Sequence, residues 1–167
     1  MNLNDKIPGA PSFTWGELVK SNTASARGID NSPTDQKYWG NLQYLAQKCL
    51  QPARDHFGVP LIINSGYRGS ELNKAIGGSP TSFHSTACAA DVDFGSAKTP
   101  SLYDLFCFFH GNTPFTELIA EELPNGWIHI ALQKGRENEK QLKYKLVGGS
   151  VKRATFDEIK KIIRPEA

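Results

Sequence analysis

The chain has 167 residues, of which 39% are hydrophobic and 22% are charged, and its formal net charge is +2. This composition is ordinary for a soluble globular protein, and the length allows one domain, residues 1–167, with its own core. A net charge of +2 is too small to indicate nucleic acid as a partner. No apolar segment of the sequence is long enough to span a bilayer, and Met1–Lys6 lacks the apolar run of a secretory signal.

The chain contains three cysteines, Cys49, Cys88 and Cys107. An odd number without close pairs argues against a disulfide scaffold and against a structural zinc ribbon. We expect each cysteine to behave as a small buried hydrophobic residue.

In the first third of the chain, residues 1–12 are predicted to be irregular and residues 21–31 to form a polar loop. Between them, the capping box of Thr14 and Glu17 predicts a short helix to about Lys20. The longest helix is predicted from Ser32-Pro33-Thr34 to about Phe57. Pro52 lies inside this helix and should kink it or split off its last turn.

The middle of the chain alternates short strands and helices. Residues 61–64 form a short apolar run that predicts a strand, and 70–76 predict a short helix ended by two glycines. A loop at 79–86 then leads to a predicted strand at 89–94. Residues 101–110 are apolar on most faces and predict a buried helix.

The last third is predicted to contain an antiparallel hairpin, with strands at 118–123 and 127–132 around the turn 124–126. Residues 142–147 predict a final edge strand. A second capping box starts a helix at 155 that ends before 165. The sequence therefore predicts an α+β fold in which helices pack on a small, mostly antiparallel sheet.

Two histidines and an aspartate are candidate metal ligands. His84 lies in a loop, and Asp91 and His129 lie in two of the predicted strands. Because side chains alternate along a strand, one sheet face can gather Asp91 and His129, with His84 above it. Imidazole and carboxylate suit zinc, although other divalent metals tolerate them, and a catalytic zinc site typically has three protein ligands. Asp93 shares the face of Asp91 and is expected to be an outer carboxylate or a surface residue.

A hydrolytic zinc site also needs a general base. The candidates are Glu117, Glu121 and Glu122, just before the turn. If Asn125-Gly126 is a tight two-residue turn, Glu122 lies opposite His129, whereas a longer turn could bring Glu121 nearer. Strand parity leaves these alternatives open.

Arg68 follows a predicted strand and a glycine turn. A guanidinium aimed into a cleft from such a place can hold a carboxylate or a developing oxyanion. The alternative for a lone arginine is a surface ion pair.

Several short motifs occur in a fixed order along the chain. They are Ser65-Gly66-Tyr67-Arg68, Glu71-Leu72-Asn73, Gly77-Gly78-Ser79, Ser82-x-His84, Asp91 and Trp127-Ile128-His129. Together they resemble the zinc D-Ala-D-Ala carboxypeptidase family of the Hedgehog/DD-peptidase superfamily, and are most similar to its phage-associated branch. The opening Phe13-Thr14-x-x-Glu17-Leu18, with Ser21 and Asn31-x-Pro33, also resembles that branch. The resemblance covers about residues 11–132.

The resemblance implies a zinc peptidase that cuts peptidoglycan stem peptides, either as a D-Ala-D-Ala carboxypeptidase or as an endopeptidase. It implies one Zn²⁺ ion with three ligands, which would be His84, Asp91 and His129. Arg68 would bind the substrate carbonyl or carboxylate in the transition state, and Ser82 and Trp127 would contact the substrate.

The segment Phe115–Glu121 resembles the stretch whose last glutamate is the catalytic base, which favours Glu121 over Glu122. Two positions depart from the family pattern. Ala87 stands where the family often has glycine, and Gly126 stands where several members have a glutamate three residues before the last histidine. The second departure concerns the identity of the base and not the metal ligands.

Two other classes of function compete with a peptidase. One is a non-catalytic wall-binding or structural module that keeps the metal but has lost the base, and the other is a metal-free interaction domain. We expect the protein to be a monomer that acts on a peptide of peptidoglycan. We expect neither nucleic acid as a partner nor a segment that spans a membrane. It would be made without a signal peptide, be cytoplasmic or phage-associated, and act on the cell wall after release.

Overall fold

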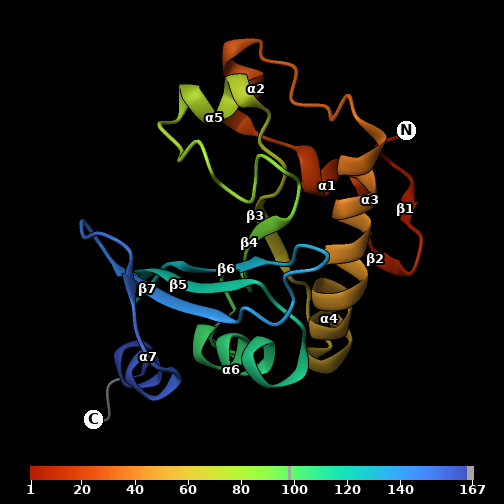
Figure 1. Ribbon diagram of the computed structural model, residues 1–167. Helices are drawn as coiled ribbons and strands as arrows, with labels where there is room; N and C mark the ends of the chain where they lie inside the picture. Colours follow the sequence, from red (N-terminus) through yellow and green to blue (C-terminus); the bar gives the residue numbers. More distant parts are fainter. Residues whose placement is uncertain (98, 165–167) are drawn as a thin grey trace.

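The computed structural model describes residues 1–97 and 99–164, which form two β-sheets and the helices around them (Figure 1). The larger sheet has the order β3 (Ile62–Ser65), β4 (Ala89–Asp93), β6 (Trp127–Ala131), β5 (Glu117–Leu123), β7 (Gln141–Leu146) and β8 (Lys152–Arg153). The smaller sheet pairs β1 (Lys6–Ile7) with β2 (Ala10–Thr14). The predicted α+β class is confirmed, with the addition of this second sheet.

The helices, apart from the second, lie in segments that the sequence predicts to be helical. They are α1 (Trp15–Val19), α2 (Asn22–Arg27), α3 (Gln36–Leu45), α4 (Gln51–Phe57), α5 (Ser70–Ala75), α6 (Leu102–Asn112) and α7 (Phe156–Ile163). The capping boxes predicted at Thr14 and Thr155 are both present. Within these described ranges, no helix combines the length and apolarity needed to cross a membrane.

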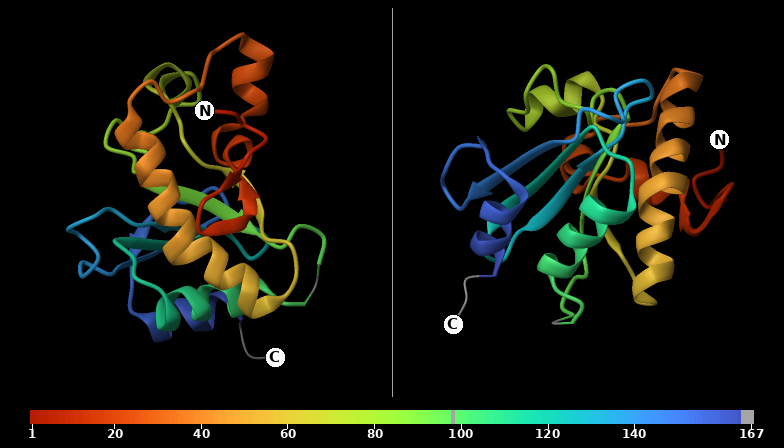
Figure 2. Two further views of the ribbon diagram at one scale, coloured as in Figure 1. Left: turned by 90° about the vertical axis from the view of Figure 1, so that its right-hand side faces the viewer. Right: turned by 60° about the horizontal axis from the view of Figure 1, so that its bottom comes forward.

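The six-stranded sheet has one apolar face and one polar face. Helices α6 and α7 lie against the apolar face, below the sheet in Figure 1, and α3 and α4 run along its side (Figures 1 and 2). Leu105, Phe106 and Phe109 of α6 and Ile128 and Ile130 of β6 are fully buried in this core. The opposite face is turned toward α2 and α5 and carries the polar side chains described below.

Two predictions for the first third of the chain were wrong. Residues 1–12 are not irregular throughout, because β1 and the first part of β2 lie there. The predicted loop at 21–31 contains α2, which Ser21 caps by accepting a hydrogen bond from the Ala24 amide. Ala24 is buried, and Gly28 ends the helix with a φ of 64°. The burial of Ala24 and the caps at Ser21 and Gly28 therefore stabilise a helix that its polar sequence does not indicate.

The long helix predicted at 32–57 is present but starts later and contains a π-helical turn. Asp35, rather than Ser32 or Thr34, caps α3. The π-helical turn Ala46–Leu50 joins α3 to α4 and ends two residues before Pro52. Because a proline ring clashes with the carbonyl four residues earlier, the wider turn lies where the sequence predicts a kink or a split of the helix.

The hairpin is confirmed, since β5 and β6 pair antiparallel with Glu121 opposite Trp127. Residues 142–147 are predicted to form an edge strand, and this segment largely coincides with β7, which does not lie at the edge. Strand β7 pairs parallel with β5, and β8 lies beyond it at the edge. The sheet is therefore mixed, although its other pairings are antiparallel.

Candidate metal centre

His84 lies in a tight turn between α5 and β4. The Ala87 amide donates to the His84 carbonyl at 3.1 Å, and the Cys88 amide donates to the Phe83 carbonyl at 2.9 Å. These paired bonds place Ala87 in the left-handed region, with a φ of 59°. Glycine adopts that conformation most easily, which gives a physical reason for the glycine expected at this position.

A backbone carbonyl orients the imidazole of His84. Its Nδ1 lies 2.7 Å from the Gly66 oxygen, so Nδ1 carries the proton and donates it there. Gly66 packs against the end of α1, where an added Cβ would lie 2.2 Å from the Leu18 oxygen. The orientation of His84 therefore depends on a glycine, and it leaves the lone pair of Nε2 facing the sheet.

Asp91 and His129 lie directly opposite each other on β4 and β6. Asp91 Oδ1 is 2.9 Å from His129 Nδ1 and 3.2 Å from His84 Nε2, and the two imidazole nitrogens are 3.1 Å apart. The three side chains, predicted from positions far apart in the sequence, thus converge on one point. His84 is 1% exposed, His129 5% and Asp91 9%, so the cluster is buried.

The donor set fits zinc. Two imidazole nitrogens and one carboxylate oxygen are typical zinc ligands, at about 2.0–2.2 Å from the ion. Atoms at that radius in a tetrahedral arrangement are about 3.3 Å apart, close to the separations found here. His84 would bind through Nε2, Asp91 through Oδ1 and His129 through Nδ1.

Without a metal, the pKa values of the three side chains shift in different directions. Burial lowers the pKa of His84, which outweighs the attraction of Asp91. Burial also opposes charge on His129, but the hydrogen bond to Asp91 and the nearby carboxylate of Glu117 outweigh it and raise the pKa of His129 to about 9. Burial would raise the pKa of Asp91, yet the two imidazoles hold it below its usual range. A metal therefore has to displace a proton from His129 at neutral pH.

The turn after β5 decides which glutamate faces the metal cluster. Glu122 to Gly126 form a five-residue connection between the paired residues Glu121 and Trp127, so the two-residue turn is wrong. Gly126 closes it, because an added Cβ would lie 1.7 Å from the Glu121 oxygen. Ile119 therefore lies opposite His129, and Glu121 shares the face of His129 two residue pairs further along.

The three candidate bases have different surroundings. Glu122 has a φ of 51° and forms an ion pair with Lys145. Glu117 forms an ion pair with Lys143 and lies 3.3 Å from Nε2 of His129. Glu121 has no cation within 4.0 Å among the residues that the structure describes. Burial and the charge of Asp91 raise the pKa of Glu121.

Arg68 lies at the turn after β3, and its charge acts on the same site. Its Nη2 donates to Ser82 Oγ at 3.3 Å, while Nε is buried without a hydrogen-bond partner. Burial lowers the pKa of Arg68, and the charges of Asp91 and Glu121 oppose this. No carboxylate of residues 1–97 and 99–164 forms an ion pair with it, so the surface ion pair considered above is absent.

Buried Asn31 holds the backbone around Arg68. Its amide nitrogen donates to the carbonyls of Val19 and Tyr67, each at 2.8 Å, and its oxygen accepts from the Gly69 amide at 2.8 Å. Asn31 was one of the residues of the family resemblance, and this clamp gives its physical role.

The remaining sequence candidates lie at the margins of the cluster. The Ser82 hydroxyl accepts hydrogen bonds from Arg68 and from the His84 amide. Trp127 is half-buried, with a buried Nε1 that lacks a partner in the described structure. Asp93 is half-buried and accepts from Asn64 and from the Gly95 amide, and no hydrogen bond or ion pair of the described residues joins it to the three candidate ligands.

Sequence reasoning missed the part played by Lys143, which lies on β7 and reaches Glu117. The parallel pairing of β7 with β5 brings it there, with Lys143 opposite Ile119. The alternation of Lys143 and Lys145 with apolar neighbours indicates a common face, but it does not identify the neighbouring strand.

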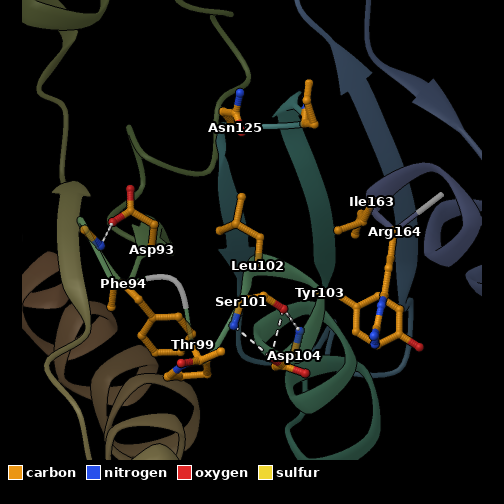
Figure 3. Close-up of a pocket in the computed structure, with 15 residues that line it drawn as sticks. Asp93, Phe94, Thr99, Ser101, Leu102, Tyr103, Asp104, Asn125, Ile163 and Arg164 are labelled. Carbon is orange, nitrogen blue, oxygen red and sulfur yellow. Dashed lines mark hydrogen bonds between the residues drawn. The ribbon is translucent and has the colours of Figure 1, made fainter. Parts of the chain in front are cut away.

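Two cavities differ in their relation to the cluster. One of about 580 Å³ lies between the end of β4, the start of α6 and the end of α7, where Asp93, Ser101, Tyr103 and Arg164 line it (Figure 3). It contains none of the three candidate ligands. Another, of about 460 Å³, includes Arg68 in its lining, together with residues of β3 and α5 and the segment Lys20–Thr23.

Comparison with known protein families matches residues 11–131 to the family described as Peptidase M15. The match includes Arg68, all three candidate metal ligands and Glu121. It ends at the last residue of β6, so β7, β8 and α7 lie beyond it. A comparison with curated proteins found no match.

Proposed function

We propose a function from one premise: the chain belongs to the peptidase M15 family, and it is therefore a metallopeptidase with a peptide substrate. The proposed reaction is zinc-dependent hydrolysis of a peptide bond in the stem peptides of bacterial peptidoglycan. The observation that carries the proposal is the convergence of His84, Asp91 and His129 within hydrogen-bond distance of one another.

The three side chains would hold the ion through Nε2, Oδ1 and Nδ1. The chemistry that zinc supplies in such a site is Lewis acidity toward a peptide carbonyl and a water pKa lowered to ~7. The Gly66 carbonyl keeps His84 in the tautomer that this binding requires. The direct pairing of β4 with β6 keeps Asp91 and His129 together.

Glu121 is the proposed general base. It shares the sheet face of His129 and has no ion-pair partner among the described residues, unlike Glu117 and Glu122. A base must take a proton from water and then give it to the leaving amine. The raised pKa of Glu121, caused by burial and by Asp91, favours the first of these steps because it makes the carboxylate a stronger base.

Arg68 is the proposed anchor for the substrate. Its guanidinium is fixed by Ser82 at one nitrogen and retains donors for a carbonyl or a carboxylate of the peptide. The cavity of about 460 Å³ beside Arg68 offers space for the adjoining part of the substrate. Ser82 and Trp127 are proposed to border the bound peptide on either side of the metal.

We further propose that the protein reaches its substrate after release to the cell wall, and that it derives from a phage or prophage. Either a terminal D-Ala or a bond within the stem or cross-link fits the chemistry above. A wall-binding module that keeps the metal without catalysis remains the competing hypothesis.

Defined muropeptides incubated with the purified protein, with fragments identified by mass spectrometry, test the proposal. We expect a single bond to be cut, with cleavage abolished by a chelator and by Glu121→Ala, and retained in Glu122→Ala. Binding to peptidoglycan without any fragment release in the zinc-loaded protein would contradict it and favour the non-catalytic module.

A further inference from the structure

The outer nitrogen of His129 is a buried donor that faces a carboxylate. Nε2 has no hydrogen bond of good geometry in the described residues, and Glu117 Oε1 lies 3.3 Å from it. The side chains of His129 and Glu117 are 7% and 11% exposed, so water does not readily replace this contact. A separation of 3.3 Å between a ring nitrogen and a carboxylate oxygen is near the upper limit of a hydrogen bond, so Glu117 offers an acceptor to this donor.

The other oxygen of Glu117 is held by Lys143. Lys143 lies on β7 and its side chain is 20% exposed. A carboxylate paired with an ammonium acts as an anionic acceptor. Glu117 is thus anchored on one side by a residue beyond the segment that matches the family.

The direction of these contacts follows from the groups involved. An ammonium only donates and a carboxylate only accepts, so Glu117 accepts from Lys143, and its other oxygen can only accept from Nε2–H of His129. A neutral imidazole with its proton on Nε2 has its lone pair on Nδ1. Nδ1 is the atom that faces Asp91 and His84.

We propose that Glu117, anchored by Lys143, is a positioning residue that keeps the His129 proton on Nε2 and so leaves Nδ1 free for the metal. The inference rests on the metal-binding part of the proposed function and is independent of peptide hydrolysis. It also gives β7 a role in the site, through a contact that the family match does not include.

A second ion pair supplies a matched control. Glu122 on β5 and Lys145 on β7 form the same kind of contact, and their side chains are 25% and 29% exposed. Glu122 makes no contact with His84, Asp91 or His129 among the hydrogen bonds and ion pairs of the described residues. Glu122→Gln therefore makes the same change of charge on the same two strands without touching a ligand.

Glu117→Gln gives the sharpest test. Lys143 can only donate, so the glutamine oxygen should turn to Lys143 and its NH₂ group to Nε2 of His129. That arrangement moves the imidazole proton to Nδ1 and blocks the metal. We expect the zinc Kd, measured by competition with a chelator at fixed pH, to rise about 10- to 100-fold. Glu122→Gln should stay within about twofold of the wild type.

The double variant Glu117→Gln with Lys143→Met separates positioning from a loss of fold. Without Lys143 the amide can turn its oxygen to Nε2, so zinc affinity should recover relative to Glu117→Gln alone. Lys143→Met alone should weaken binding less than Glu117→Gln, because the carboxylate still cannot donate. Thermal unfolding of the metal-free variants checks that each one folds.

Nitrogen-15 NMR of the zinc-loaded wild type provides a direct readout, and we expect the His129 proton on Nε2. A proton on Nδ1, or a Glu117→Gln variant with unchanged zinc affinity, would overturn the inference. A further loss of affinity in the double variant would do the same. A protein that binds zinc as expected but cuts no muropeptide would leave this inference standing and contradict only the proposed hydrolysis.

Discussion

Asp91 Oδ1 and His129 Nδ1 face each other at 2.9 Å across two adjacent antiparallel strands. The sheet register sets this pair, because a shift of one strand by one residue would place the two side chains on opposite faces of the sheet. His84 joins them from a turn that is fixed independently by Gly66 and Ala87. The cluster therefore combines one rigid sheet element with one separately braced loop.

The role of Glu121 can be tested by an isosteric change. Glu121→Gln removes the proposed base without removing a metal ligand, so hydrolysis should fall by about 10²- to 10⁴-fold. Zinc content should remain that of the wild type. The measurement is a rate on a defined muropeptide, with Glu122→Gln as the control. Equal losses of hydrolysis rate in the two variants would contradict the assignment of Glu121, rather than Glu122, as the base.

Arg68 is expected to act on the substrate rather than on the metal. Arg68→Met keeps the length of the side chain but removes its donors, and kcat/KM should fall by about 10²- to 10³-fold. Arg68→Lys should recover only part of this, because an ammonium lacks the planar fork. Zinc Kd measured on the same samples should not change. A parallel loss of zinc would mean that Arg68 stabilises the site instead.

Ala87 offers a test of the turn that carries His84. Its left-handed backbone costs a non-glycine residue roughly 1–2 kcal/mol, while its buried methyl group contributes about 0.8 kcal/mol. Ala87→Gly should therefore change the unfolding free energy by about 1 kcal/mol or less, because these two effects oppose each other. A branched side chain suits neither the backbone nor the space, so Ala87→Val should be clearly destabilising in urea denaturation. Equal stability of the two variants would contradict this account of the turn.

The stability of the metal-free protein should depend on pH through His129. Its pKa is raised from 6.5 to about 9 in the folded state, because Asp91 and Glu117 outweigh burial. Stabilisation from this group is thus fully present below pH 6.5 and is lost as the pH rises through 9. Urea denaturation of the chelator-treated protein should show this decline between about pH 6.5 and 9. His129→Asn should lack it, and an identical decline in that variant would assign the effect elsewhere.

Much of the fold could be predicted from local patterns, and the exceptions have physical causes. The capping box at Thr14 and the hairpin at 118–132 carry their signals within a few residues. Helix α2 depends on the burial of Ala24, which its polar sequence does not reveal. The parallel pairing of β7 with β5 depends on contacts between distant segments, and no local pattern specifies them.

The residues of the site likewise divide into those that local patterns predict and those that depend on contacts between distant segments. His84, Asp91 and His129 could be proposed from residue type and strand alternation. The proposed choice of Glu121 over Glu122 depends on the length of the turn, which is a five-residue connection closed by Gly126. The contact of Lys143 with Glu117 could not be predicted, because it depends on which strand lies beside β5.

Zinc measured per chain by elemental analysis, after dialysis against zinc-free buffer, tests the central claim most directly. The account predicts about one zinc ion per wild-type chain and almost none in Asp91→Ala or His129→Ala, with both variants folded. Zinc retained equally by the wild type and these variants would contradict a metal centre at this cluster. So would a wild-type protein that binds no zinc when the metal is supplied in excess.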